Sequence, residues 1–259
     1  FYKECKKQGI KPIIGCEVYV APQSRFDKTS SYGKYYHMVL LCKNHTGYQN
    51  LIKLVSKGFT EGFYTKPRID DELLAEYHEG LVCLSACLAG EIPQKLLDGD
   101  YAGAKSKAEF YRDMFGSENF FIELQDHGIE EQKRIIPSLI KIAREIGVDI
   151  VATNDCHYIE KQDSTVHNIL LCIQTNRTVN DSDRMEFKTS EFYLKTEDEM
   201  REVFASYPEA IDNTQKIADI CNVDFEFGVR KLPRFDVPNN EDHLHYFRRK
   251  CYEGLYKHY

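Results

Sequence analysis

The sequence predicts an α/β fold in which parallel strands form a sheet or a barrel. Short apolar runs rich in β-branched residues alternate with stretches whose apolar residues recur at helical spacing. The 259 residues are 42% hydrophobic, which is enough for one large domain, or for one domain and part of another. Glycines such as Gly58 and Gly147 stand where the predicted helices end.

The predicted elements follow one another along the chain. Apolar runs predict strands over 11–20, 36–42, 81–87, 120–124 and 148–152. Helical spacing predicts helices over 46–59, 70–77, 92–97, 101–115, 130–146, 164–174, 196–205 and 209–221. Residues 1–8 resemble the end of a helix stopped by Gly9, so we expect the chain to begin inside a domain. After Gly228, the segments 231–233 and 237–240 resemble a linker, and 241–259 resembles a helix of another domain.

Composition narrows the classes of function. The formal net charge of −7 argues against broad, nonspecific nucleic-acid binding through this segment, although it is compatible with a local basic groove. No apolar run reaches the roughly eighteen residues of a membrane span, and no secretory signal is visible. Nine scattered cysteines without CxxC pairs favour reduced thiols in the cytoplasm over a disulfide framework.

The most informative stretch is Val151–Tyr158, where an apolar strand ends in Asp155-x-His157. On an extended chain, positions two residues apart point to the same side. A carboxylate and an imidazole arranged in this way can reach one metal ion or one substrate phosphate. Asp155 and His157 are therefore the first candidates for a functional site.

Three further polar residues, Glu17, His37 and Cys87, also lie in or beside apolar strands. Residues near the carboxyl ends of barrel strands converge on one mouth, and a mixture of carboxylate, imidazole and thiolate suits zinc, manganese or iron. Each residue also has an ordinary interpretation. A lone strand Glu is usually exposed, a core His often bonds a backbone carbonyl, and a free Cys is often simply buried.

The Asp126-His127 pair after the fourth strand is a rival site, ranked lower because adjacent strand residues point apart. Glu123 in that strand either lines a barrel or pairs with a basic side chain. The remaining histidines have polar or helical surroundings that favour surface positions: His45, His78, His167, His243, His245 and His258.

Several long strings, taken together, resemble the alpha subunits of bacterial replicative DNA polymerase III, which belong to the C family. The strings are GIKPIIGCEVYV, YHMVLLCKNHTGYQNL, GLVCLSACLAGEIP, VATNDCHYI and LPRFDVPNN, in the order that this family shows. The resemblance implies that residues 1–230 are a PHP (polymerase and histidinol phosphatase) domain lacking its first β/α unit. Its fold would be a distorted, TIM-like (β/α)7 barrel with a trinuclear metal site, truncated at its N-terminus. Residues 231–259 would be a linker and the start of the polymerase palm region.

The family's metal ligands can be placed motif by motif. Its GxE glutamate falls on Glu17, its next strand histidine on His37, and the position filled by cysteine on Cys87. Its final DxH motif falls on Asp155 and His157. The family's HxH motif, and the Asp and His that follow it, would precede the first residue, and its polymerase aspartates would follow the last. We therefore expect about half of the ligand set here, and a segment that does not polymerise DNA alone.

The resemblance implies a part of a DNA-directed DNA polymerase, a nucleotidyltransferase of DNA replication. Its PHP domain would be a metal-dependent 3′–5′ exonuclease with Asp155 and His157 in catalytic positions, using hydroxide activated by Zn, Mn or Fe, while the parent polymerase would use Mg. DNA, dNTPs, a sliding clamp and other replisome subunits would be partners in the cytoplasm, with no membrane association. The alternatives are a purely structural metal-binding PHP domain and a stand-alone PHP phosphoesterase. The late palm-like segment argues against the stand-alone enzyme.

Overall fold

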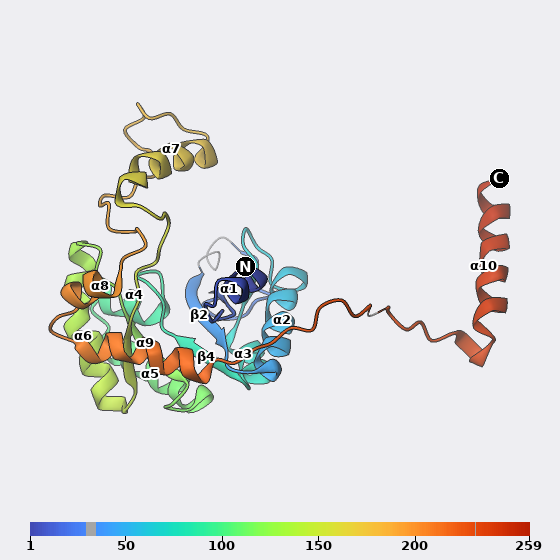
Figure 1. The fold of residues 1–259 in the computed structure, drawn as a ribbon, viewed down its shortest axis with the longest axis horizontal. Helices are drawn as coiled ribbons and strands as arrows, with labels where there is room; N and C mark the ends of the chain where they lie inside the picture. Colours follow the sequence, from blue (N-terminus) through green and yellow to red (C-terminus); the bar gives the residue numbers. More distant parts are fainter. Residues whose placement is uncertain (30–34, 231) are drawn as a thin grey trace. The chain divides into compact units, whose positions relative to one another are not determined.

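A computed structural model describes residues 1–29, 35–230 and 232–259 (Figure 1). The chain divides into two compact units, Phe1–Val223 and Asp224–Tyr259. The first unit holds the sheet and the helices that cover it. The second holds helix α10 (His243–His258), a 3₁₀ turn at Pro238–Asn240 and extended chain. The helix predicted over 241–259 is therefore present.

The first unit is built on a six-stranded mixed sheet with the order β3-β1-β2-β4-β5-β6. Its strands are β1 (Gly15–Val20), β2 (Tyr36–Cys42), β3 (Arg68–Ile69), β4 (Leu81–Leu84), β5 (Phe120–Leu124) and β6 (Asp149–Ala152). The α/β class is confirmed, and the architecture is consistent with a distorted TIM-like fold. The two-residue strand β3 was not predicted, because its run is too short to show a period.

The expectation of a parallel sheet is wrong at β2, which pairs antiparallel with both β1 and β4. The pairs β1–β3, β4–β5 and β5–β6 are parallel. Parallel neighbours need a crossover connection, commonly a helix, whereas antiparallel neighbours can be joined by a loop. The described residues between Val20 and Tyr36 contain no helix, so the chain returns in the opposite direction.

The helices of the first unit follow the predicted order. They are α1 (Tyr2–Lys7), α2 (His45–Thr60), α3 (Asp71–Tyr77), α4 (Glu91–Leu97), α5 (Tyr101–Phe115), α6 (Glu130–Ile146), α7 (Ser164–Thr175), α8 (Glu197–Val203) and α9 (Pro208–Ile220). Asn44 and Asp70 start α2 and α3 by accepting backbone N–H groups with their side chains. Gly147 ends α6 in the left-handed conformation at a φ of 70°. Among the described residues, no helix is both long and apolar enough to cross a membrane.

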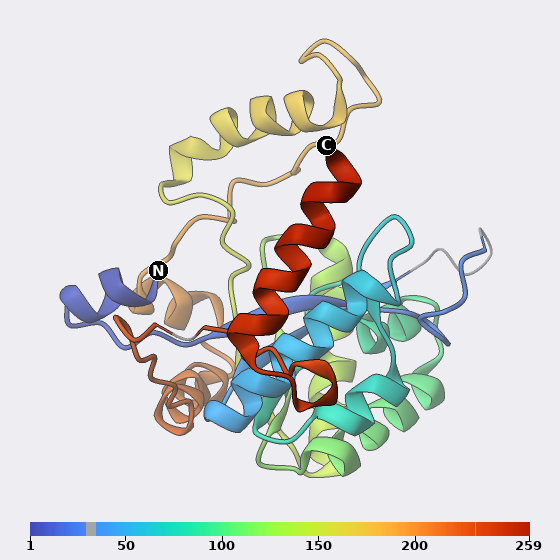
Figure 2. The same ribbon diagram turned by 90° about the vertical axis from the view of Figure 1, so that its right-hand side faces the viewer.

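Buried strands in the middle of the sheet form the core. Every residue of β4 and β5 is buried, and helices α2, α5 and α6 pack on the sheet (Figure 2). Helix α9 lies along β6, where Ile217 packs with Leu84, Phe121 and Val151. Full burial of large apolar side chains contributes roughly 1.5–3 kcal/mol each. The packed core therefore holds in place the strands that carry or precede the candidate site residues.

Candidate metal centre

Glu17, His37 and Cys87 come together beside the neighbouring strands β1 and β2. In the β1–β2 register Tyr19 faces His37 and Glu17 faces Val39, so Glu17 and His37 are diagonal neighbours on one face. Glu17 Oε1 lies 2.5 Å from His37 Nδ1. The His37 backbone N–H donates to Ala89 O (3.0 Å), which ties the loop after β4 to β2. That loop places Cys87 Sγ 3.6 Å from the same Nδ1 atom.

In the cluster formed by Glu17, His37 and Cys87, the proton is held on His37. Hydrogen bonds to the Cys87 sulfur and to Glu17 raise the pKa of His37 to about 10, so its Nδ1 is protonated at neutral pH. The hydrogen bond from His37 lowers the pKa of Glu17, and the positive charges of His37 and His157 lower it further. Glu17 and Cys87 therefore face a single cationic position. A metal ion commonly replaces a proton at such a position.

Asp155 and His157 lie on a turn rather than on an extended strand. Strand β6 ends at Ala152, and Asp155 has a φ of +43°, in the left-handed region. The premise that an extended backbone aligns the two side chains is therefore wrong. The turn aligns them instead: His157 Nδ1 lies 2.7 Å from the Asp155 carbonyl oxygen and 3.7 Å from its carboxylate Oδ1.

The geometry of His157 fits a metal ligand. Its Nδ1 can donate to the Asp155 carbonyl, which fixes the ring and leaves Nε2 as the nitrogen with a lone pair. Metal-binding histidines usually use their second ring nitrogen in this way. Ala86, next to Cys87, also has a positive φ of 66°. Strained backbone of this kind is concentrated at functional sites.

Across the described residues, no group of three or more His, Cys, Asp or Glu side chains surrounds one point as a ready metal cage. Glu17 and Cys87 contact the His37 nitrogen itself instead of enclosing a space beside it. The charge of His157 reaches Glu17, so the two parts of the candidate site are electrostatically coupled. The donor set of carboxylate, imidazole and thiol suits zinc, manganese or iron.

The rival pair has a different arrangement. His127 is fully buried, and both of its ring nitrogens contact protein groups: Gln132 Nε2 at Nδ1 and Asn154 O at Nε2. Burial lowers the pKa of His127. Asp126 accepts the backbone N–H of Gly128 (2.8 Å), as expected in a turn.

Glu123 faces the interior without a basic partner within hydrogen-bond distance among the described residues. Thr153 and Gln125 donate to its Oε1, whereas its Oε2 is buried and unpaired. Burial raises the pKa of Glu123 to about 7, although hydrogen bonds from Thr153, Gln125 and the Ala86 backbone lower it. The nearby charge of Asp155 adds to the rise. Of the two interpretations offered for Glu123, pairing with a basic side chain is wrong.

His167 was predicted at the surface, but it is half-buried beside His157. The two rings lie 5.4 Å apart in an edge-on arrangement, and Phe187 contacts both. Burial lowers the pKa of His167, as does the charge of His157. No local pattern predicts this contact, because it depends on how the chain returns from the turn to helix α7.

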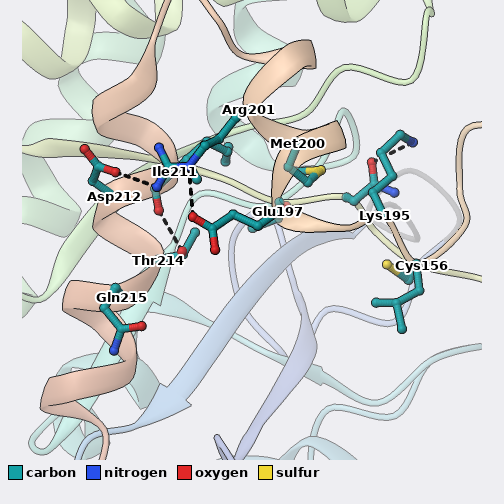
Figure 3. A pocket seen from close by; sticks show the side chains of 13 residues that line it. Cys156, Lys195, Glu197, Met200, Arg201, Ile211, Asp212, Thr214 and Gln215 are labelled. Carbon is teal, nitrogen blue, oxygen red and sulfur yellow. Dashed lines mark hydrogen bonds and ion pairs between the residues drawn. The ribbon is translucent and has the colours of Figure 1, made fainter.

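A cavity of about 590 Å³ lies beside the same turn, lined by Asn154, Cys156 and residues of α8 and α9 (Figure 3). Arg201 donates to Glu197 and to Asp212, at 2.9 Å in both cases. The second cation of the cavity, Lys195, is paired with Glu191 (3.3 Å). Because Arg201 and Lys195 are already paired with carboxylates, this cavity is a poor site for an anion. The cluster around His37 therefore remains the candidate metal centre.

Comparison with known proteins finds a match to one domain family and to several longer proteins. Residues 1–127 match the PHP domain. Over the whole chain, the sequence is 49% identical to a DNA polymerase III subunit alpha from Treponema pallidum across 262 residues. It is 44% identical to that of Thermus aquaticus across 271 residues and 41% identical to that of Deinococcus radiodurans across 270. All of this chain is aligned in each case, but only 22%, 22% and 20% of the relatives, so the chain spans about a fifth of their length.

Proposed function

We propose that the chain is a PHP segment of a bacterial replicative DNA polymerase, because residues 1–127 match the PHP domain. The full-length alignment to polymerase III alpha subunits supports this proposal. The domain would extend over residues 1–230, and residues 231–259 would begin the palm region. The parent would be a cytoplasmic DNA-directed DNA polymerase that binds DNA, dNTPs, a sliding clamp and other replisome subunits, with Mg at its polymerase site.

We propose that the segment contributes a metal-dependent 3′–5′ exonuclease site. Glu17, His37 and Cys87 would hold one side of a Zn, Mn or Fe centre, and Asp155 and His157 the other. A bound divalent ion supplies electrostatic stabilisation to phosphate oxygens and makes water available as a nucleophile near neutral pH. To bind an ion as a neutral ligand, His37 would have to lose one of its two ring protons, so binding would release a proton.

One observation supports this proposal most: Glu17 and Cys87 converge on the same nitrogen of His37, at 2.5 and 3.6 Å. An ordinary core histidine needs a single acceptor for its N–H. Two anionic or potentially anionic groups at one nitrogen are what a cation site requires. His157, with its Nδ1 fixed by a backbone carbonyl, is a second preoriented imidazole.

The test is 3′–5′ degradation of a mispaired primer terminus by the natural full-length protein in Mn²⁺ or Zn²⁺. The Asp155→Asn substitution removes the carboxylate charge and should lower the rate at least about 100-fold, because ligand loss weakens both metal binding and charge stabilisation. The matched control is Asp126→Asn, which alters a nearby acid that only accepts a turn N–H. Equal rates for wild type and Asp155→Asn would refute the exonuclease proposal.

A second candidate function is a structural metal domain. The cluster around His37 is closed by hydrogen bonds among its own side chains, which suits a site that stabilises the fold. In that case chelation would lower the melting temperature, and no nuclease activity would accompany metal binding. Chelation that abolishes nuclease activity without changing the melting temperature would rule out this candidate.

A further inference from the structure

We infer that His127 is a positioning residue for the Asp155-x-His157 turn, holding its backbone in the conformation that ligand binding needs. This inference rests on the proposed metal site. His127 lies in the loop after β5, and the turn follows β6, the neighbouring strand. Its ring is 0% exposed, so it contacts no substrate and acts through its neighbours.

The hydrogen bonds of His127 define which nitrogen carries the proton. The backbone N–H of His127 donates to Gln132 Oε1 at 2.8 Å. This contact orients the Gln132 amide, so its Nε2 donates to His127 Nδ1, also at 2.8 Å. With Nδ1 accepting, the neutral ring carries its hydrogen on Nε2, which donates to the Asn154 carbonyl oxygen at 2.8 Å.

Asn154 is held from both sides. Its carbonyl accepts from His127, while its side-chain amide donates to Glu191 O (3.1 Å) and Tyr193 O (2.6 Å). The next residue is Asp155, with its φ of +43°. A non-glycine residue persists in this region only when the surroundings enforce it. The contact between His127 and Asn154 is part of that enforcement.

A stacking contact links His127 to the other end of the turn. Its ring is stacked on Phe192, with centroids 4.0 Å apart and planes 13° from parallel. The Phe192 carbonyl accepts the backbone N–H of His157 at 2.8 Å. His127 therefore supports both ends of the turn: it donates a hydrogen bond to Asn154, and it packs on Phe192, which in turn binds the His157 backbone. Because both ring nitrogens are engaged, His127 acts on the metal only indirectly.

Two substitutions separate the hydrogen bond from the packing. His127→Phe keeps a flat ring against Phe192 but leaves the Asn154 carbonyl without its donor. His127→Gln removes the ring but places an amide N–H where Nε2–H was. The control is His78→Phe: His78 contacts the Ala75 carbonyl and packs on Phe115, near the amino end of β4.

The measurement is titration of the natural full-length protein with Mn²⁺ or Zn²⁺ alone, by calorimetry and by the Mn²⁺ paramagnetic resonance spectrum. His127→Phe should weaken metal binding by about 10–100-fold, and His127→Gln should recover most of the affinity. His78→Phe should bind as wild type does. A purely structural role would lower the melting temperature of both His127 variants without this difference between them.

The outcomes are distinguishable. If wild type binds metal and His127→Phe binds it equally well, the positioning role is refuted and the proposed function survives. If wild type binds neither ion, the proposed function fails, and the positioning role with it. If His127→Phe does not fold, Gln132→Met replaces it, because that substitution removes the group that orients the ring. Wild-type affinity in Gln132→Met would also refute the inference.

Discussion

Replacing Glu123 with glutamine should abolish a loss of folding stability that wild type shows as the pH rises. Glu123 is 4% exposed, accepts hydrogen bonds from Thr153 and Gln125 rather than from a basic side chain among the described residues, and has a pKa raised by burial from 4.5 to about 7. Below pH 4.5 the carboxyl is protonated in both the folded and the unfolded state. Between pH 4.5 and 7 the unfolded chain releases the proton while the folded chain keeps it. The free energy of unfolding therefore falls as pH rises through this window.

The magnitude follows from the two pKa values. A rise from 4.5 to about 7, at about 1.4 kcal/mol for each pH unit, corresponds to about 3 kcal/mol lost between pH 4.5 and 8. Glutamine keeps an oxygen that can accept from Thr153 and Gln125 but cannot ionise. Glu123→Gln should therefore be as stable as wild type near pH 4.5 and more stable at pH 8, by up to that amount.

Urea unfolding followed by circular dichroism, with a chelator present, measures this difference at half-unit pH intervals. The difference between the free energies of unfolding of Glu123→Gln and wild type at each pH removes the contribution of histidines that titrate in the same range. The matched control is Glu118→Gln, which alters an exposed acid in the turn before β5. Parallel curves for wild type and Glu123→Gln between pH 4.5 and 7 would refute the assignment of a raised pKa to Glu123.

Three further substitutions test the scaffold. Asp70→Ala should lower the free energy of unfolding in urea by about 3–5 kcal/mol, because Nη1 of buried Arg25 loses both oxygens of its carboxylate partner and α3 loses its cap; a cost below 1 kcal/mol would contradict this. Gly47→Ala should lower the free energy of unfolding by about 1–3 kcal/mol or more, because the added Cβ would lie 1.8 Å from the Gly80 carbonyl oxygen. Gly254→Ala, in open space within a helix, should instead be neutral or stabilising by up to about 1 kcal/mol.

Much of the fold could be predicted because local patterns agree with it. Strands β2 and β5 and helices α5 and α6 have the predicted bounds, and capping residues such as Asp100 mark the helix starts. The predicted strand over 81–87 ends early at Leu84, since Ala86 adopts a left-handed conformation. The direction of β2 was not predictable, because it depends on the connection before it rather than on the strand's own residues.

The candidate site was partly predictable. Polar residues in or beside apolar strands indicated Glu17, His37 and Cys87, and the structure brings these three side chains into contact. The sequence drew attention to Glu123 and His127 but could not indicate what these two buried residues do. Their roles depend on neighbours from other strands, such as Thr153 and Asn154, and only the folded chain brings those together.

The metal centre can be tested directly by anomalous X-ray diffraction from crystals of the natural protein grown with Zn²⁺. We predict anomalous peaks about 2.0–2.3 Å from donor atoms of the cluster formed by Glu17, His37 and Cys87, with His157 Nε2 and the Asp155 carboxylate binding an ion in the same centre. The Nδ1 proton of His37 would then be gone, and Glu17 would face the ion. A protein saturated with Zn²⁺ that shows no peak beside any of these five residues would contradict the proposed centre.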